Sequence, residues 1–472
     1  MDALTCPALI ESTTSLKSAV PVLSCSAVSS KGIEFIVVEE IFSLWHLIAM
    51  VVVTICFLVD RFLISKQKTE IGLYLVLLVH LAFFSAVTYG PLNDYSAYEE
   101  GLRALLSGTH IYGGNTRYLL NFPIIAGSLG LVYRILSPIF PPGADQPINS
   151  TELVVVFCVF QTAQLAMIGA GYLLSKKYME RLGLGENVAS IVCTVLWLLC
   201  GPIYKVVSKG QINLFVLDFF LVSVVLAESK PVLAGMAAAA GSFMKIYPAA
   251  TAGGAVLARR KKLLIGFALG TVLMLLIQTM LCGVNTWIDF INAVKSFPVA
   301  NPFVDAEIKY QPSISNAVYI IFRMAAPASL EENAAVIHGL IIVASVLVGC
   351  WFIWRIFRRE RSYKQLPSEM LLNNQSQYDV QRFTGHATDL VGAGLLLSPH
   401  VWPQHYVMAL PMIMCSLSGV HPLSITAIVG IVVLMLGNPS ALPSPAYLCY
   451  AFLKPIGLIL LLHSQPPSIK AR

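Results

Sequence analysis

Long apolar runs separated by short polar stretches dominate the chain from residue 41 onward. Runs such as 41–63, 153–174, 263–281 and 336–354 come close to or exceed the roughly 20 residues that a helix needs to cross a bilayer. A spanning segment must satisfy its backbone hydrogen bonds internally, and a membrane barrel would show short alternating segments instead. The pattern therefore predicts an all-α fold, a polytopic membrane bundle with roughly ten to twelve membrane helices.

Proline residues and charges interrupt several of these runs, so we expect some helices to be broken or re-entrant. Pro123 falls inside the run 118–139, which we expect to be bent because the parity of the neighbouring basic clusters forbids a simple crossing. Lys245 lies in the middle of the run 231–257, which predicts two half-helices that meet there. The polar stretch 398–406 separates two apolar segments too short to span alone and predicts a second break.

The basic clusters beside the apolar runs set the expected domain organisation and orientation. Residues 1–40 read as a poorly ordered N-terminal extension, and residues 41–465 as one integral-membrane domain. The positive-inside rule places loops 90–117 and 284–316 on the lumenal or outer face and loop 355–386 in the cytosol. The same rule places the C-terminus in the cytosol.

Composition agrees with a membrane protein and excludes other classes. The chain of 472 residues is 57% hydrophobic and 12% charged, against about 25% charged residues in soluble domains. The net charge of +6 does not indicate nucleic-acid binding, because the basic residues cluster beside apolar segments. The ten cysteines show no C-x-x-C pattern, so no metal or redox motif is indicated. Asn149 begins an Asn-Ser-Thr glycosylation pattern, which leans towards a eukaryotic source.

The stretch 89–114 combines polar chemistry with helical spacing at a membrane surface. Asp94 lies beside Tyr95 and Tyr98, and leucines then recur at helical spacing, which predicts a short amphipathic helix along the interface. Asp94 is either the base of an active site in this outer catalytic loop or simply the N-cap of that helix.

Unusual polar residues gather on the same predicted face as this loop. They are Asp94, Gln211, Lys245, Arg323 and His405. Charged groups within membrane segments are costly and are candidates for function by default, although each alone could be an interfacial or core residue. Tyr95, Tyr98 and Trp402 are further candidates on the side of an acceptor.

A carboxylate opposite several cations suits one reaction in particular, the transfer of a sugar from a lipid-linked phosphate. Asp94 would accept the proton of an attacking hydroxyl, while His405, Lys245 and Arg323 would stabilise the leaving phosphate and Gln211 would bind the donor. The outer loops hold no carboxylate cluster for a metal, so we expect no metal and no cofactor other than the lipid-linked donor.

Five short motifs occur in the order seen in a known family. They are an Asp-Tyr loop running on to A-L-L-S-G-T-H-I-Y, then G-Q-I-N-L, A-G-M-A-A-A-A-G-S-F-M-K-I-Y-P, Q-P-S-I-S-N and L-S-P-H-V-W-P-Q-H-Y. In these the chain resembles glycosyltransferase family 87, the polyprenyl-phosphate-mannose-dependent α-mannosyltransferases of the C-type membrane glycosyltransferase superfamily. The motifs span about residues 90 to 410.

The resemblance implies roles for individual residues. The catalytic aspartate of the family would be Asp94, and its histidine after the Ser-Pro-x-x-Trp motif would be His405, facing the donor phosphate. Gln211 and Lys245 match the G-Q-x-N and K-x-x-P positions. The implied reaction moves mannose from a polyprenyl (dolichyl) phosphate to a lipid or glycan acceptor, with an α product by inversion of a β-linked donor. The membrane would be the endoplasmic reticulum in a eukaryote or the plasma membrane in a bacterium.

Two other functions stay open on the sequence alone. The Lys-Ile-Tyr-Pro motif is also similar to the mannosyltransferase of glycosylphosphatidylinositol synthesis, which usually carries a double acidic motif where this chain has only Asp94. A lipid or solute transporter would also use broken helices and buried charges, but it predicts inverted repeats that the sequence does not show.

Overall fold

The computed structural model shows helices throughout the part of the chain that it describes. It describes residues 44–60, 70–84, 94–112, 121–139, 150–296, 312–325, 333–418, 423–436 and 444–467. The helices are Leu44–Val59, α2 (Ile71–Phe84), α3 (Tyr95–Leu106), α4 (Pro123–Leu136), α5 (Ser150–Arg181), α6 (Glu186–Leu199), α7 (Gly201–Lys209), α8 (Asn213–Leu226), α9 (Pro231–Ser242), α10 (Ala249–Leu257), α11 (Lys261–Cys282), α12 (Asn285–Ser296), α13 (Ile314–Ala325), α14 (Ala334–Lys364), α15 (Ser368–Leu397), the 3₁₀ helix η4 (Pro403–Ala409), α16 (Leu410–Leu417), α17 (Ile425–Met435) and α18 (Ser444–Ser464).

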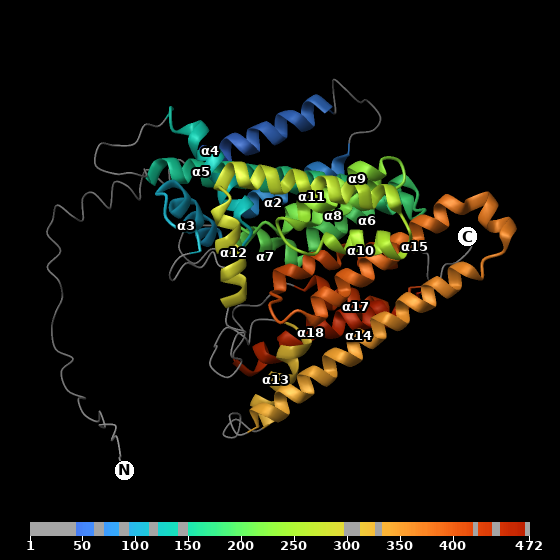
Figure 1. Cartoon of the computed structure of the whole chain (residues 1–472). Coiled ribbons are helices and arrows are strands. Elements are labelled where there is room, and N and C mark those ends of the chain that lie inside the picture. The colour runs from blue at the N-terminus through green and yellow to red at the C-terminus, as the bar shows by residue number, and fades with distance from the viewer. Residues whose placement is uncertain are drawn as a thin grey trace, which may run out of the picture.

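Helices α5, α8, α9 and α11 form the densest part of the bundle, each packed against the next (Figure 1). Glycine allows α9 and α11 to approach closely, because a Cβ atom on Gly235 or Gly266 would collide with the backbone of the facing helix. Small residues serve this purpose in membrane helix pairs generally. The Ala- and Gly-rich motif before Lys245 is therefore a packing surface.

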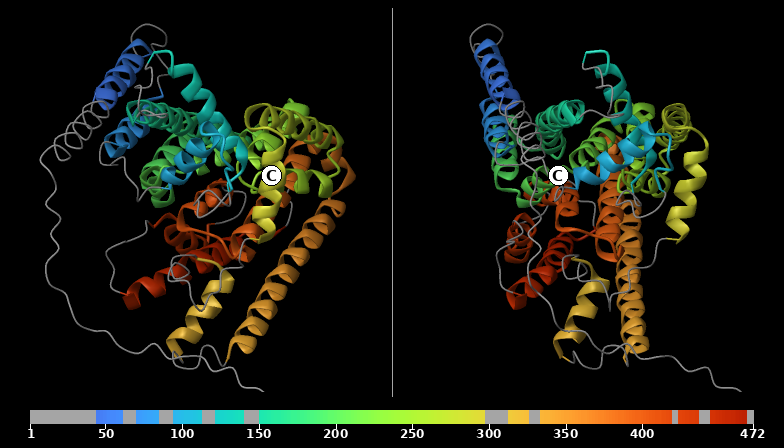
Figure 2. Two further views of the ribbon diagram at one scale, coloured as in Figure 1. Left: turned by 60° about the vertical axis from the view of Figure 1, so that its left-hand side comes forward. Right: turned by 90° about the vertical axis from the view of Figure 1, so that its left-hand side faces the viewer.

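Helices α13 to α18 form a second group beside the first, and α14 runs along its flank as a long strut (Figure 2). Helix α15 returns antiparallel to α14 and also packs against α10, which joins the two groups. Figure 1 shows α3 and α12 at one end of the bundle, and the connection between α14 and α15 at the opposite end. We call these the α3 end and the α14–α15 end.

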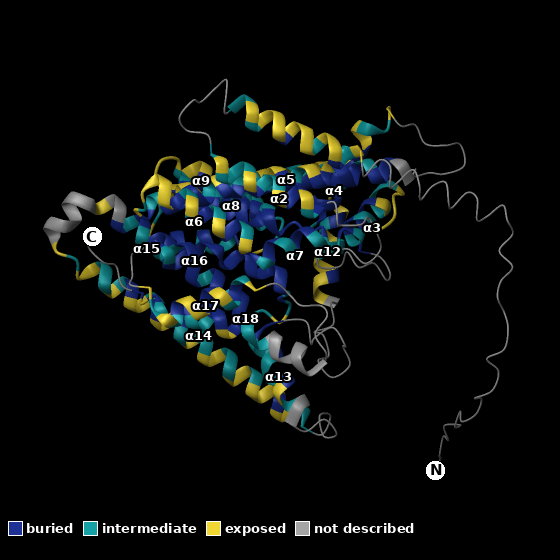
Figure 3. Cartoon of the chain, turned by 180° about the vertical axis from the view of Figure 1, so that it is seen from behind, coloured by how far each residue is buried: buried dark blue, intermediate teal, exposed yellow. Residues whose placement is uncertain are grey.

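Many large hydrophobic residues lie on the outer surface. Figure 3 shows the exposed positions in yellow along the outer helices. Three described helices are long and apolar enough to cross a membrane, Glu152–Arg181, Lys261–Cys282 and Ala334–Lys364, and the pair α6–α7, bent by 52°, would make a fourth. In the span Ala334–Lys364 only 11% of the most apolar window is buried in the protein. A surface of this kind requires lipid, and the predicted all-α, polytopic membrane bundle is confirmed.

Both predicted helix breaks occur in the structure. The run 231–257 divides into α9 and α10, with Lys245 in the connection. The stretch 398–402 separates α15 from η4. The run 118–139 contributes only the 14-residue helix α4, which begins at Pro123. The expected N-terminal extension 1–40 and the glycosylation candidate Asn149 lie outside the described residues.

Two stretches expected to be loops contain helices. Helices α12 and the start of α13 fall within 284–316, and α14 and α15 extend through most of 355–386. The amphipathic spacing of Trp287, Phe290 and Val294 places apolar groups on one side of α12, a pattern compatible with an interfacial helix. Within 355–386, Arg355, Arg359 and Arg382 are buried and pair with carboxylates of the facing helix, so this polar stretch is only partly exposed to solvent.

A buried ion network accounts for this second difference. Arg355 and Arg359 of α14 both bind the carboxylate of Asp389 on α15, with nitrogen–oxygen distances of 2.9 and 2.6 Å. Nη1 of Arg355 also donates to the carbonyl oxygens of Leu462 and Gln465 beyond it. The network fastens α14, α15 and the end of α18 together at the α14–α15 end.

We predict that Asp389→Asn destabilises the protein by about 3–5 kcal/mol, because it leaves two buried guanidinium groups without their counter-charge. Thermal unfolding in lipid nanodiscs measures the loss. Arg358→Gln is the matched control, since Arg358 is exposed and lies over the ring of Trp354. Equal melting temperatures for Asp389→Asn and wild type would contradict the role of the network.

Candidate active site

Asp94 occupies the N-cap position of α3, but its side chain makes no capping hydrogen bond. Its carboxylate oxygen Oδ2 instead accepts a short hydrogen bond from Nε2 of Gln211 and a second from Nε2 of Gln404 at 3.4 Å. The N-cap interpretation therefore describes the position of Asp94 in the chain and not what its carboxylate does. The side chain is directed at residues 117 and 310 positions away.

Gln211 is aimed at Asp94 by the turn that follows α7. Gly210 has a left-handed backbone, with φ 61° and ψ 41°, and its N–H closes the end of α7. The carbonyl oxygen of Gln211 then accepts from Nε2 of Gln164 at 2.7 Å, and its side-chain Oε1 accepts from Nδ2 of Asn213 at 2.7 Å. Since Asn213 donates to Oε1, the amide must present its N–H groups to Asp94.

Lys245 and His405 form the cationic part of the site. Lys245 lies in the break between α9 and α10, and its Nζ is 2.8 Å from Nε2 of His405 in η4. Nδ1 of His405 lies 3.4 Å from the backbone nitrogen of Trp402 and 3.3 Å from the hydroxyl of Tyr247. When Nε2 accepts from the Lys245 ammonium, the Nδ1–H donates to the hydroxyl of Tyr247; in the other tautomer Nδ1 accepts from the N–H of Trp402.

The ammonium group of Lys245 has hydrogen-bond donors to offer a ligand. A charged Lys245 that donates one N–H to Nε2 of His405 keeps two further N–H groups. An anion beside the pair would accept from these groups, and the oxygens of a phosphate have the required lone pairs. The pair is therefore suited to an anionic ligand.

The later motifs meet around the same point. The hydroxyl of Tyr406 donates to the carbonyl oxygen of Pro312 at 2.8 Å, and Nδ2 of Asn316 donates to that of Pro399 at 3.4 Å. The Q-P-S-I-S-N segment thus supports the loop that carries His405. Asp94 also interacts electrostatically with Lys245 and with Lys205 of α7.

Four of the residues predicted from the sequence come together in this way. Asp94, Gln211, Lys245 and His405 form one connected cluster, with Gln404 and His405 as the adjoining pair between its acidic and basic halves. Arg323 lies in α13, and its side chain is outside what the structure describes. Gln404 was not among the predicted residues. Its place beside His405 in the W-P-Q-H-Y motif was the available signal.

The aromatic acceptor-side candidates divide into two kinds. Tyr95 and Tyr98 are each only 2% exposed, and the ring of Tyr95 packs against Phe157 at 4.8 Å between centroids. Burial, with the nearby charge of Asp94, raises the pKa of Tyr98 well above its usual value, so its hydroxyl stays neutral. These two rings anchor α3 to α5, whereas Trp402 is half-buried at the start of η4.

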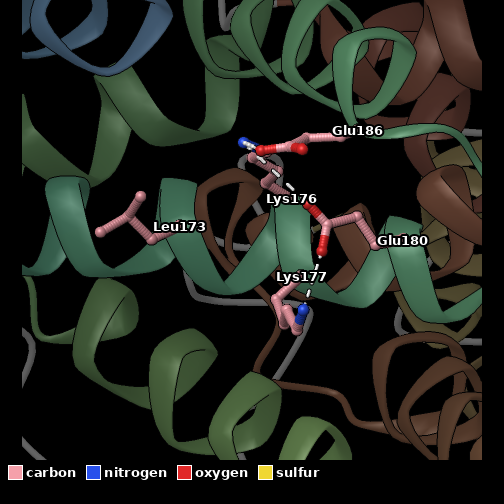
Figure 4. Close-up of a pocket in the computed structure, with 5 residues that line it drawn as sticks. All are labelled: Leu173, Lys176, Lys177, Glu180 and Glu186. Carbon is pink, nitrogen blue, oxygen red and sulfur yellow. Dashed lines mark hydrogen bonds and ion pairs between the residues drawn. The ribbon is translucent and has the colours of Figure 1, made fainter. Parts of the chain in front are cut away.

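A polar pocket of about 390 Å³ lies away from this cluster. Leu173, Lys176, Lys177 and Glu180 line it from α5 and Glu186 from the start of α6 (Figure 4). Its charges pair with one another, as in Lys177 with Glu180 at 2.9 Å and Lys176 with Glu186 at 3.4 Å. We therefore place the candidate active site at Asp94, where a carboxylate and a cation converge from distant segments. No group of three metal-binding side chains occurs among the described residues.

We predict that Gly210→Ala lowers the stability of the protein by about 1–2 kcal/mol, because a Cβ atom disfavours the left-handed backbone that directs Gln211. Thermal unfolding with a parallel activity assay measures both effects. Gly339→Ala in α14 is the matched control, since no atom lies near its Cβ position and the helix there favours alanine. A variant at Gly210 that melts like wild type would contradict the need for this turn.

Comparison with known proteins adds independent information. The model of glycosyltransferase family 87 matches residues 147–372, just under half of the chain. No curated protein matches the chain. The matched region contains Gln211 and Lys245, while Asp94 and His405 lie on either side of it. Residues 147–372 are thus similar to glycosyltransferase family 87, and this similarity supports a glycosyltransferase activity.

Proposed function

We propose that the protein transfers mannose from a polyprenyl phosphate to a hydroxyl group of a lipid or glycan acceptor, with Asp94 as the base. One observation carries the proposal: consecutive residues link the carboxylate to the cationic pair. Gln404 contacts Asp94, and the next residue, His405, contacts Lys245. An acceptor hydroxyl at Asp94 would therefore lie close to a phosphate held by Lys245 and His405.

The proposed reaction is a single displacement at the anomeric carbon. Asp94 takes the proton of the acceptor hydroxyl as that oxygen forms its bond to the anomeric carbon. The bond from this carbon to the phosphate oxygen breaks, and the polyprenyl phosphate leaves with the bonding electron pair. Lys245 and His405 stabilise the negative charge that accumulates on the leaving phosphate. No metal enters any of these steps.

The remaining residues take supporting roles in this proposal. Gln211 fixes Asp94 and borders the donor, and Arg323 is a further candidate for the phosphate. Trp402 remains a candidate for contact with the acceptor, because it is half-buried beside His405. The buried packing of Tyr95 and Tyr98 favours a structural role for both.

The choice of mannose and of a polyprenyl carrier rests on the resemblance of the five motifs. The family 87 match favours an enzyme over a transporter. The reaction on the lumenal or outer face, in the endoplasmic reticulum of a eukaryote or the plasma membrane of a bacterium, follows from the arrangement of basic residues in the sequence.

We predict that Asp94→Asn lowers transfer of radiolabelled mannose from dolichyl-phosphate mannose by about 10²–10⁴-fold, because an amide cannot accept the proton. Label in the extracted membrane lipids measures transfer, and the labelled product identifies the acceptor. Asp289→Asn is the matched control, because Asp289 of α12 pairs with His110 and lies outside the cluster.

Normal transfer by Asp94→Asn would exclude Asp94 as the base. If wild type transfers no label from the mannose donor, a panel of other polyprenyl-phosphate sugars tests the choice of sugar. If the protein transfers no sugar of the panel, the results would favour the transporter hypothesis.

We predict that Lys245→Met and His405→Gln each lower kcat with the mannose donor by about 10²–10³-fold relative to the wild-type protein. This is the usual effect of losing one group that stabilises a developing anion. Both variants should also bind the product dolichyl phosphate more weakly, since the same contacts hold its phosphate. Binding in nanodiscs and steady-state kinetics measure the two effects. Lys295→Met, on an exposed position of α12, is the control. Unchanged binding of dolichyl phosphate in both variants would show that Lys245 and His405 do not hold its phosphate.

A further inference from the structure

Gln404 lies at the junction of the two halves of the site. Its side chain is buried, with 3% of the residue exposed, and Nε2 points at Oδ2 of Asp94. The distance of 3.4 Å is long for a hydrogen bond, as is common for catalytic contacts before substrate binds. Among hydrogen bonds in the described part of the chain, this one connects the acidic half of the site directly to the loop of His405.

Two amides share one oxygen of Asp94. Nε2 of Gln211 and Nε2 of Gln404 both donate to Oδ2, one from the turn before α8 and the other from η4. Neither donates to Oδ1 in the contacts of the described residues. A carboxylate held in this way keeps Oδ1 available to accept a proton and fixes the direction in which it points.

Gln404 differs from Gln211 in its connection to the donor side. The helical turn of η4 holds residues 403–409 together, and the backbone N–H of His405 bonds to the carbonyl oxygen of Trp402 at 2.9 Å. A shift of His405 towards a bound phosphate therefore moves Gln404 with it. Gln211 lies outside η4, in the turn between α7 and α8, and its backbone carbonyl group is fixed by Gln164 of α5.

We propose that Gln404 is a positioning residue that draws the Asp94 carboxylate into line when the donor phosphate binds His405 and Lys245. This inference rests on the proposed function, because it assigns Asp94 as the base and the cationic pair as the phosphate site. Gln404 touches neither the sugar nor the phosphate. It acts through Asp94 and couples donor binding to the placement of the base.

The test is a set of Gln404 variants in the mannose-transfer assay. Gln404→Met keeps the volume of the side chain and removes its donor. We expect kcat to fall about tenfold to a hundredfold, the range for losing a hydrogen bond to a charged group, with KM for the donor changed by less than about threefold. Gln465→Met is the matched control: Gln465 is also buried, and its amide donates to the carbonyl oxygen of Met412 at 2.8 Å, outside the site.

A double-mutant cycle separates positioning from general destabilisation. If Gln404 acts through Asp94, adding Gln404→Met to Asp94→Asn should lower the residual rate no further. A role confined to packing would instead lower the rate by the same factor in both backgrounds. Equal effects in the two backgrounds, or a kcat of Gln404→Met equal to wild type, would overturn the inference.

A second readout does not depend on turnover. A water-soluble carbodiimide modifies carboxyl groups, and mass spectrometry quantifies modification of Asp94. Dolichyl phosphate should change this modification in wild type, and the change should be lost in Gln404→Met while dolichyl phosphate still binds. The same change in both proteins would overturn the coupling. If the wild-type protein transfers no mannose, the proposed function is contradicted. The carbodiimide measurement then tests the role of Gln404 by itself.

Discussion

The breaks in the membrane helices are the constraint on which the site depends. A helix that ends inside an apolar bundle leaves backbone groups that need partners, and side chains or neighbouring segments must supply them. At Gly210 the left-handed turn closes α7, and the carbonyl group of Gln211 is satisfied by Gln164. At η4 the ring of His405 accepts, in one tautomer, from the backbone N–H of Trp402. The same groups that resolve the breaks thus orient the residues that could carry out chemistry.

The charged groups at the two ends of the bundle differ in whether they are paired with opposite charges. At the α14–α15 end, Arg355 and Arg359 are both paired with Asp389, an arrangement that holds helices together. At the α3 end, the carboxylate of Asp94 is held by two neutral amides, and Lys245 faces the neutral ring of His405. Such a separation of unlike charges costs stability, and it is the arrangement expected where a substrate is to complete the network.

The sequence predicted the fold class and the main breaks because hydrophobic length and interrupting charges report directly on the membrane. It also predicted one face for Asp94, Gln211, Lys245, Arg323 and His405, since parity of the helices requires no knowledge of packing. The structure brings the four of them whose side chains it describes into one cluster. It could not predict that 355–386 is helical, because the burial of Arg359 depends on Asp389, thirty residues away. It also could not predict the bend at Cys200 between α6 and α7, or that Tyr95 packs inward.

Gln404 shows most clearly what sequence patterns leave out. An amide beside a histidine has no signature of its own, and its contact with Asp94 spans 310 positions of the chain. Its role can be recognised only in the folded chain, where Gln404 of η4 contacts Asp94 at the start of α3. Under the proposed function, a base held by the donor-side loop would be set in place together with the donor. That dependence would protect the enzyme from unproductive activation of its acceptor, because the carboxylate would reach its working position only with the phosphate bound.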